Sequence, residues 1–212
     1  PEPEPPTYNY EWNYSSNLSL SSTSSHTSGT HPSNHNGSSF GNGIAVSGNW
    51  MIVGAGGHCY DTGGGVSSFL STAGMVYMYK KENNSWVEKQ KITSSTRTAS
   101  AQFGSHVDMD GDYAIVRESY KYSIYKRDGN TWNLQTISGS LYGSSDYCYA
   151  PKICGDYAVG TFPNKDTGGA IVVLKRNGTI WNQIQKYTSN DIEASDLFGG
   201  CCYFNIDYIV VS

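Results

Sequence analysis

Hydrophobic and polar positions in residues 40–212 follow a recurring pattern. Four stretches begin with an aromatic residue and carry a second aromatic residue ten positions later. The stretches are FGNGIAVSGNWMIVGA from Phe40, FGSHVDMDGDYAIVRE from Phe103, YCYAPKICGDYAVGTF from Tyr147 and FGGCCYFNIDYIVVS from Phe198. Their Gly, Tyr, Val and Ile content indicates many short strands joined by tight turns.

A second unit follows the first three of these stretches. It reads VYMYKKENNSW, YSIYKRDGNTW and IVVLKRNGTIW, and in each copy a lysine precedes a tryptophan by six residues. The pairs are Lys80 with Trp86, Lys126 with Trp132 and Lys175 with Trp181. Chance rarely preserves such spacings three times, so the two units together form one internal repeat.

Each repeat is expected to supply four strands. The first follows the aromatic-Gly pair, and a turn such as Asp110-Gly111 leads to the second, DYAIV. The third ends in Lys-Arg or Lys-Lys, and the fourth is a strand such as TWNLQTI that bears the tryptophan. Four antiparallel strands in every 40–60 residues indicate a β-propeller blade. The predicted fold class is all-β, with three blades, the start of a fourth, and the first strands innermost.

These residues resemble the FG-GAP repeat of integrin alpha-chain-like β-propellers. The Phe-Gly half is kept at Phe40-Gly41, Phe103-Gly104 and Phe198-Gly199, and the nearest approach to the second half is VGAGG, from Val53 to Gly57. The resemblance implies a β-propeller, in a family that hosts adhesion, scaffolding and carbohydrate-facing roles. Such propellers normally have about seven blades. The repeats of residues 40–212, with blade starts near 40, 103, 147 and 198, are therefore expected to belong to a longer protein or to be completed by other chains.

Residues 1–39 form a separate block that is rich in Pro, Ser and Thr. One interpretation is an extended, disordered or glycosylated stalk, because such a composition buries too little apolar surface to fold. The other rests on Tyr8, Tyr10 and Trp12, which alternate with polar residues as in a strand. Such an arm is suited to adding a strand at an exposed sheet edge, and we expect self-association of the protein through it.

Charge and composition narrow the partners and the location. The chain has a net charge of −4 with 15% charged residues, which is no footprint for nucleic acid. Nothing in it is apolar enough over about 18 residues to span a membrane. Five cysteines and five Asn-x-Ser/Thr sequons favour the secretory route and an extracellular or cell-surface location. Covalent glycans are expected at Asn83 and Asn177 first, and then at Asn13, Asn17 and Asn36.

The segment Asp108-Met109-Asp110-Gly111-Asp112 resembles the start of a calcium loop. Its continuation lacks the later Gly and Asp, and the equivalent segments of the other repeats do not supply three carboxylates. Calcium takes six to eight oxygen ligands, which a two-residue hairpin cannot present. The segment is therefore expected to be a turn without a metal ion.

Four of the five cysteines are expected to gather at one rim of the blades, with Cys154 at the opposite turn. Cys59 follows a second strand, and Cys148, Cys201 and Cys202 lie at the starts of first strands. A disulfide from Cys148 to Cys201 or Cys202 would join adjacent blades. A zinc site built from His58, Cys59, His106 and Cys201 is a weaker alternative, because no close ligand pair is present.

The sequence offers no set of catalytic residues. It contains neither a G-x-S-x-G elbow nor a phosphate-cradling loop after a strand, so we expect neither an enzyme nor a cofactor. The tryptophans at 86, 132 and 181 are expected to pack between blades rather than to stack on sugars. The favoured function is a non-enzymatic extracellular glycoprotein module for adhesion, surface coat or filament assembly. The alternative is a carbohydrate-binding propeller or an accessory domain of a secreted hydrolase.

Overall fold

The structure, a computed structural model, describes residues 38–62, 69–138, 148–164, 168–188 and 197–212. In these ranges the chain forms strands, turns and bends, and no helix. Accordingly, no segment of the described ranges has the length and hydropathy of a membrane-spanning helix. The fold class predicted from the sequence is confirmed.

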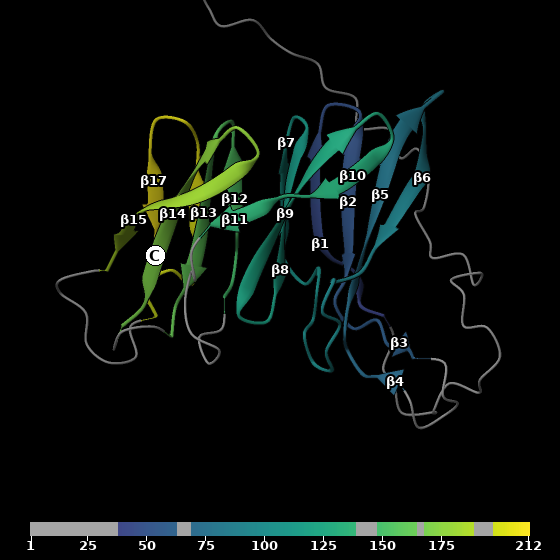
Figure 1. The fold of residues 1–212 in the computed structure, drawn as a ribbon, viewed down its shortest axis with the longest axis horizontal. Helices are drawn as coiled ribbons and strands as arrows, with labels where there is room; N and C mark the ends of the chain where they lie inside the picture. Colours follow the sequence, from purple (N-terminus) through teal and green to yellow (C-terminus); the bar gives the residue numbers. More distant parts are fainter. Residues whose placement is uncertain (1–37, 63–68, 139–147, 165–167, 189–196) are drawn as a thin grey trace, which may run out of the picture.

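Three antiparallel sheets stand side by side along the long axis of the molecule (Figure 1). The first blade contains, in spatial order, β1 (Phe40–Ser47), β2 (Trp50–Ala55), β5 (Met75–Glu82) and β6 (Ser85–Ile92). The second contains β7 (Val107–Asp110), β8 (Tyr113–Glu118), β9 (Lys121–Asp128) and β10 (Thr131–Leu134). The third contains β12 (Lys152–Cys154), β13 (Tyr157–Phe162), β14 (Ala170–Asn177) and β15 (Ile180–Tyr187).

Two short hairpins lie outside these three sets of four strands. β3 (Tyr60–Asp61) and β4 (Phe69–Leu70) pair in the connection between β2 and β5. β16 (Cys202–Phe204) and β17 (Ile209–Val211) pair antiparallel beside the third blade, and we call them the last hairpin. They correspond to the predicted first two strands of a fourth blade.

Each blade therefore places its strands in chain order, with the tryptophan-bearing strand fourth. The first strands of neighbouring blades contact one another, as β1 does with β7 and β7 with β12. These inner strands are also joined by a hydrogen bond from the Gly111 N–H to Ser47 Oγ, at 2.8 Å. The order of strands within a blade is the one that the sequence predicted.

The core consists of layers between successive blades. On β8, Ala114 and Val116 face a cluster shared with the first blade, whereas Ile115 faces a cluster shared with the third blade. Successive side chains of a strand point to opposite faces, and a strand between two blades buries both of them. This explains why the second strands read as short apolar runs without polar alternation.

The Phe-Gly pair shapes the contact between blades. Phe103 is fully buried between the first and second blades, and Gly104 follows it with a φ of 88°. A Cβ on Gly104 would lie 2.6 Å from Val76 Cγ1 and 2.7 Å from the Met75 carbonyl oxygen. Glycine is required at this position because the backbones of two blades approach too closely for a side chain.

The fourth strand of the second blade differs from the prediction. TWNLQTI was expected to be one strand, but β10 ends at Leu134, and β11 (Thr136–Ser138) pairs in parallel with β15 of the third blade. Leu134 is exposed, whereas Ile137 packs against the core between the second and third blades. Burial of Ile137 favours the transfer of this segment to the neighbouring sheet, which thereby gains a fifth strand.

Candidate functional site

The same side-chain arrangement is found at two joints, one between the first and second blades and one between the second and third blades. At the first joint, the Trp132 ring meets the Trp50 ring edge to face, with centroids 5.6 Å apart. The Arg127 guanidinium lies 5.1 Å from the Trp50 ring centroid and forms an ion pair with Asp112 of its own blade. The set thus contains an aromatic residue on one blade and a Trp, an Arg and an Asp from the next blade. We call this set the blade clamp.

The second joint repeats the blade clamp with other residues. Trp181 meets the Tyr113 ring at 5.6 Å, again edge to face. Arg176 lies 4.8 Å from the Tyr113 ring centroid and pairs with Asp156. An edge-to-face aromatic pair contributes about 0.5–1.5 kcal/mol beyond its buried area, and a cation above a ring contributes about 0.5–1 kcal/mol at exposed sites.

The third aromatic position of this series is Tyr157, and its surroundings are different. Its ring has Lys175 of the same blade 5.1 Å away. Within the described residues, neither a tryptophan nor an arginine from the last hairpin reaches it. A groove of about 320 Å³ lies there instead.

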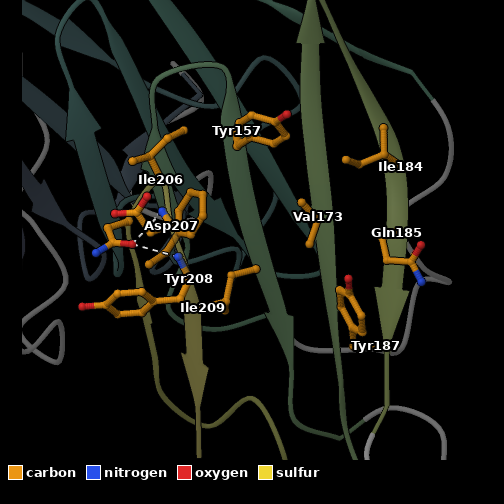
Figure 2. A pocket seen from close by; sticks show the side chains of 11 residues that line it. Tyr157, Val173, Ile184, Gln185, Tyr187, Ile206, Asp207, Tyr208 and Ile209 are labelled. Atoms are coloured by element: carbon orange, nitrogen blue, oxygen red, sulfur yellow. Dashed lines mark hydrogen bonds between the residues drawn. The ribbon is translucent and has the colours of Figure 1, made fainter.

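Figure 2 shows how this groove is walled. Tyr157 and Val173 lie at its centre, Ile184, Gln185 and Tyr187 on one side, and residues 206–209 of the last hairpin on the other. The turn of that hairpin is held by Asn205, whose Oδ1 accepts hydrogen bonds from the N–H groups of Asp207 and Tyr208, both at 2.9 Å. Asp207 occupies the place that Asp112 and Asp156 hold in the two complete clamps.

The edge of the last hairpin is open in the described part of the chain. β17 pairs there with β16 alone, and a second hollow of about 640 Å³ runs along it. One face of the hairpin packs on the third blade, with Ile209 and Val211 against Val159 and Ile171. The other face exposes four large apolar side chains, each more than half accessible: Tyr203, Ile206, Tyr208 and Val210.

The aspartates of the suspected calcium loop each have a protein partner. Asp108 Oδ2 accepts a hydrogen bond from the Ile153 N–H at 3.0 Å, and Asp110 Oδ2 accepts one from the Gly155 N–H at 2.7 Å. Asp112 pairs with Arg127. Two carboxylates thus tie the inner strand of the second blade to that of the third, and the absence of an ion here stays a prediction.

Burial changes the pKa of one of these groups. Desolvation raises the pKa of the Asp108 carboxyl, and the hydrogen bond from Ile153 and the charge of Lys152 offset the rise only in part. Because Lys152 Nζ lies 3.8 Å from Asp108 Oδ1, that ion pair also links the two blades.

The predicted glycosylation sites fall in two groups. Asn83 lies in the exposed turn between the third and fourth strands of the first blade, and Asn177 is the exposed last residue of β14, directly before the equivalent turn of the third blade. Asn13, Asn17 and Asn36, together with the arm residues Tyr8, Tyr10 and Trp12, lie outside the described residues. Glycosylation at all five positions stays a prediction.

The cysteines are thiols in the structure, and the suggested disulfide from Cys148 to Cys201 or Cys202 is not formed. Cys148 is buried between the second and third blades, and its Sγ donates to the Ser119 carbonyl oxygen at 3.1 Å. Cys202 is buried under the last hairpin, whereas Cys201 is exposed. Burial raises the pKa of both buried thiols to about 11.

The zinc alternative gains no support from the geometry. The described residues, which include His58, Cys59, His106 and Cys201, contain no group of three or more metal-ligating side chains. Trp132 and Trp181 are buried between blades, as expected. Trp86 differs from the expectation, because it packs against a cluster of its own blade that contains Tyr77 and Tyr79.

The groove itself was not identified from the sequence. Tyr157 and Tyr208 were recognised there as strand residues, and Ile184 and Tyr187 were not singled out. The sequence signal for the joints lies in the series Trp50, Tyr113 and Tyr157, because Trp50 and Tyr113 each receive a Trp and an Arg from the next repeat.

Comparison with known proteins agrees with the repeat pattern. No curated protein matches the chain. The profile of a family described as FG-GAP repeat matches residues 86–131, which run from β6 of the first blade to β10 of the second. Residues 86–131 therefore match an FG-GAP repeat, which agrees with the four-stranded blades of the fold.

Proposed function

We propose that this chain is a non-enzymatic, extracellular glycoprotein module that assembles with copies of itself for adhesion, surface-coat or filament formation. The observation that carries the proposal is the groove beside Tyr157 together with the edge of β17, which pairs with β16 in the described residues. An unpaired strand edge beside an apolar groove is a template for another strand.

The occupant that we propose for this edge is residues 7–14 of a second copy. In the complete blades the third strand lies beside the second and directs alternate side chains toward the preceding blade, as Val172 and Leu174 of β14 do within the cluster shared with the second blade. TYNYEWNY has the same alternation in Tyr8, Tyr10 and Trp12. Its other positions, Asn9, Glu11 and Asn13, are polar.

The polar positions of the arm would form one face of the added strand, and that face suits the position proposed for the arm. The last hairpin is packed on one face only in the described structure, so a strand added to β17 would have one face toward the third blade and one toward solvent. β9 and β14 contribute to the core on both faces, because blades flank them on both sides. An arm that is apolar on alternate residues therefore suits an edge with one face toward the core and the other toward solvent.

The sugar part of the proposal rests on position. Asn83 and Asn177 are exposed, so a glycan attached there would extend into solvent without displacing core residues. Glycopeptide mass spectrometry of the native protein should find both asparagines modified. Two unmodified asparagines would remove the main support for an extracellular glycoprotein.

Light scattering of the full chain at several concentrations tests the assembly. Replacement of Tyr8, Tyr10 and Trp12 by Ser should abolish growth of particle mass with concentration, because it removes the side chains that would enter the groove. The matched control replaces Asn9, Glu11 and Asn13 by Ser, which should preserve assembly. Equal behaviour of the two triple variants, or a wild-type protein that stays monomeric at all concentrations, would refute the second-copy arrangement.

A further inference from the structure

A separate cavity at the rim between the first two blades contains a buried cation. The cavity has a volume of about 360 Å³. Its described lining is mostly polar and includes Asn42, Gln102, Ser105, His106, Arg117 and Tyr149. Nothing in the assembly proposed above uses this cavity, which lies at the first and second blades rather than at the last hairpin.

Arg117 is the central group of the cavity. It is only 5% exposed, and no carboxylate in the described residues forms an ion pair with it. Its Nε donates to the Cys148 carbonyl oxygen at 2.5 Å, and Nη1 donates to Ser105 Oγ at 2.6 Å and to Gln102 Oε1 at 3.4 Å. These are neutral acceptors, and they leave Nη2 without a described partner.

The neighbouring groups do not balance the charge of Arg117. The Cys148 thiol is kept neutral, because burial raises its pKa to about 11. Glu118 follows Arg117 in the chain, but its carboxylate accepts a hydrogen bond from Ser94 and pairs with Lys121. A buried charge is costly unless it is paired, so the cavity favours an anion from outside the chain.

A second unsatisfied group lies beside Arg117. The Nδ1 atom of His106 is buried without a hydrogen-bond partner. Burial and the charge of Arg117 lower the pKa of this imidazole, which favours its neutral form. His106 lines the cavity together with Arg117, so its neutral imidazole adds a polar group to the fork of guanidinium donors that suits the two oxygens of a carboxylate.

The rest of the lining suits a sugar ring. Tyr149 is 37% exposed, and its ring lies 5.5 Å from the Arg117 guanidinium and 6.0 Å from the His106 ring. The side chains of Asn42, Thr72 and Gln102 supply amide and hydroxyl groups around the opening. One fixed positive charge matches the single negative charge of a carboxylate better than the higher charge of a phosphate.

We propose that this rim cavity binds a sugar that carries a carboxylate, such as a uronic acid, with the carboxylate at Arg117 and His106 and the ring beside Tyr149. Isothermal titration calorimetry of the full chain with glucuronate, glucose and acetate separates the contribution of the carboxylate to binding from that of the sugar ring. Glucuronate should bind with a stoichiometry of one and raise the melting temperature, because selective binding to the folded state stabilises it. Glucose and acetate should each bind at least tenfold more weakly.

Three variants test which residues contribute to glucuronate binding. Arg117→Lys keeps the charge but loses the fork of donors, and it should weaken glucuronate binding at least tenfold. Tyr149→Ala is at an exposed position and tests the cavity even if the Arg117 variant does not fold. It should weaken glucuronate binding several-fold and leave acetate binding unchanged. Tyr208→Ala, at the last hairpin, is the control and should bind glucuronate like the wild type.

Several results would overturn the proposal. Equal binding of glucose and glucuronate would remove the role of the carboxylate. Equal binding of acetate and glucuronate would remove the sugar. No binding of glucuronate by the wild type, or unchanged binding by Tyr149→Ala, would show that the cavity is not the site. Because Tyr8, Tyr10 and Trp12 are unaltered in these proteins, failure here is distinguishable from failure of self-association.

Discussion

The joint between the second and third blades and the groove beside the last hairpin are built on the same strand position. Tyr113 and Tyr157 each begin the second strand of a blade, and each has a lysine of its own blade above its ring. Tyr113 also receives Trp181 and Arg176 from the next blade. Tyr157 receives neither from the described last hairpin, and the apolar surface around it is left as a groove.

The difference shows that the blade clamp depends on the outer two strands of a repeat. β16 and β17 bring Asp207 to the position of Asp156, but the Arg and Trp that complete the clamp belong to third and fourth strands. A joint with only the inner strands therefore keeps a part of the apolar contact and lacks the aromatic and cationic contacts. Three comparisons test this contrast and a fourth tests the carboxylates between the inner strands, in order of decreasing effect.

The largest effect is expected for Trp181→Ala in the complete joint. Trp181 is fully buried, so the variant should lose about 3–5 kcal/mol of the free energy of unfolding, measured by urea denaturation. Tyr157→Ala at the open groove should lose about 1 kcal/mol or less, since it removes a partly exposed ring. Similar losses in the two variants would contradict the distinction between complete and open joints.

Gly104→Ala should have the next largest effect. The added Cβ would meet Val76 and the Met75 carbonyl, and the φ of 88° is unfavourable for alanine, so we expect a loss of about 2–4 kcal/mol in thermal or urea unfolding. Gly199→Ala is the matched change at the last hairpin, where the added Cβ would lie 3.1 Å from its nearest neighbour, the Ala170 carbonyl oxygen. It should cost less than Gly104→Ala, and the reverse order would show that the last hairpin is packed as tightly as the second blade.

Arg127→Ala should cost about 1 kcal/mol. The side chain is partly exposed and pairs with an exposed Asp112, so the ion pair adds little and most of the loss comes from the contact with Trp50. Asp207→Ala is the counterpart at the open joint, where no arginine is described, and it should leave the unfolding free energy unchanged. A double-mutant cycle of Arg127→Ala with Asp112→Ala measures the share of the ion pair.

The smallest effect concerns pH. Because the pKa of Asp108 is raised in the folded chain, the folded state binds this proton more readily than the unfolded state does. The contribution of Asp108 to the free energy of unfolding therefore increases as the pH falls through its raised pKa. Asp108→Asn keeps an acceptor for Ile153 and should remove this contribution from a urea-unfolding series between about pH 7 and pH 4.

Asp110→Asn is the control for the pH series, because Asp110 makes the equivalent hydrogen bond to Gly155 in the same turn. If Asp108→Asn leaves the dependence of the unfolding free energy on pH unaltered, another group dominates it. If only Asp110→Asn removes this dependence, Asp110 rather than Asp108 is the group responsible.

Much of the blade was predictable because it repeats. The spacing of ten residues from Phe103 to Tyr113 corresponds to a first strand, a tight turn and the start of a second strand. The spacing of six from Lys126 to Trp132 corresponds to the hairpin between β9 and β10. These relations are local, and a two-residue periodicity with glycine turns determines them before any blade contacts another.

Contacts between distant residues were decided by the tertiary structure. The three aspartates near Gly111 resembled a metal loop because a sequence does not show that Ile153, Gly155 and Arg127 lie against them. β11 pairs with the third blade because burial of Ile137 there outweighs continuation of β10 in the second blade. That outcome depends on contacts with residues far away in the sequence. Arg117 is one of many charged residues in the sequence, and only the packing of the first two blades made it a buried cation beside a polar cavity.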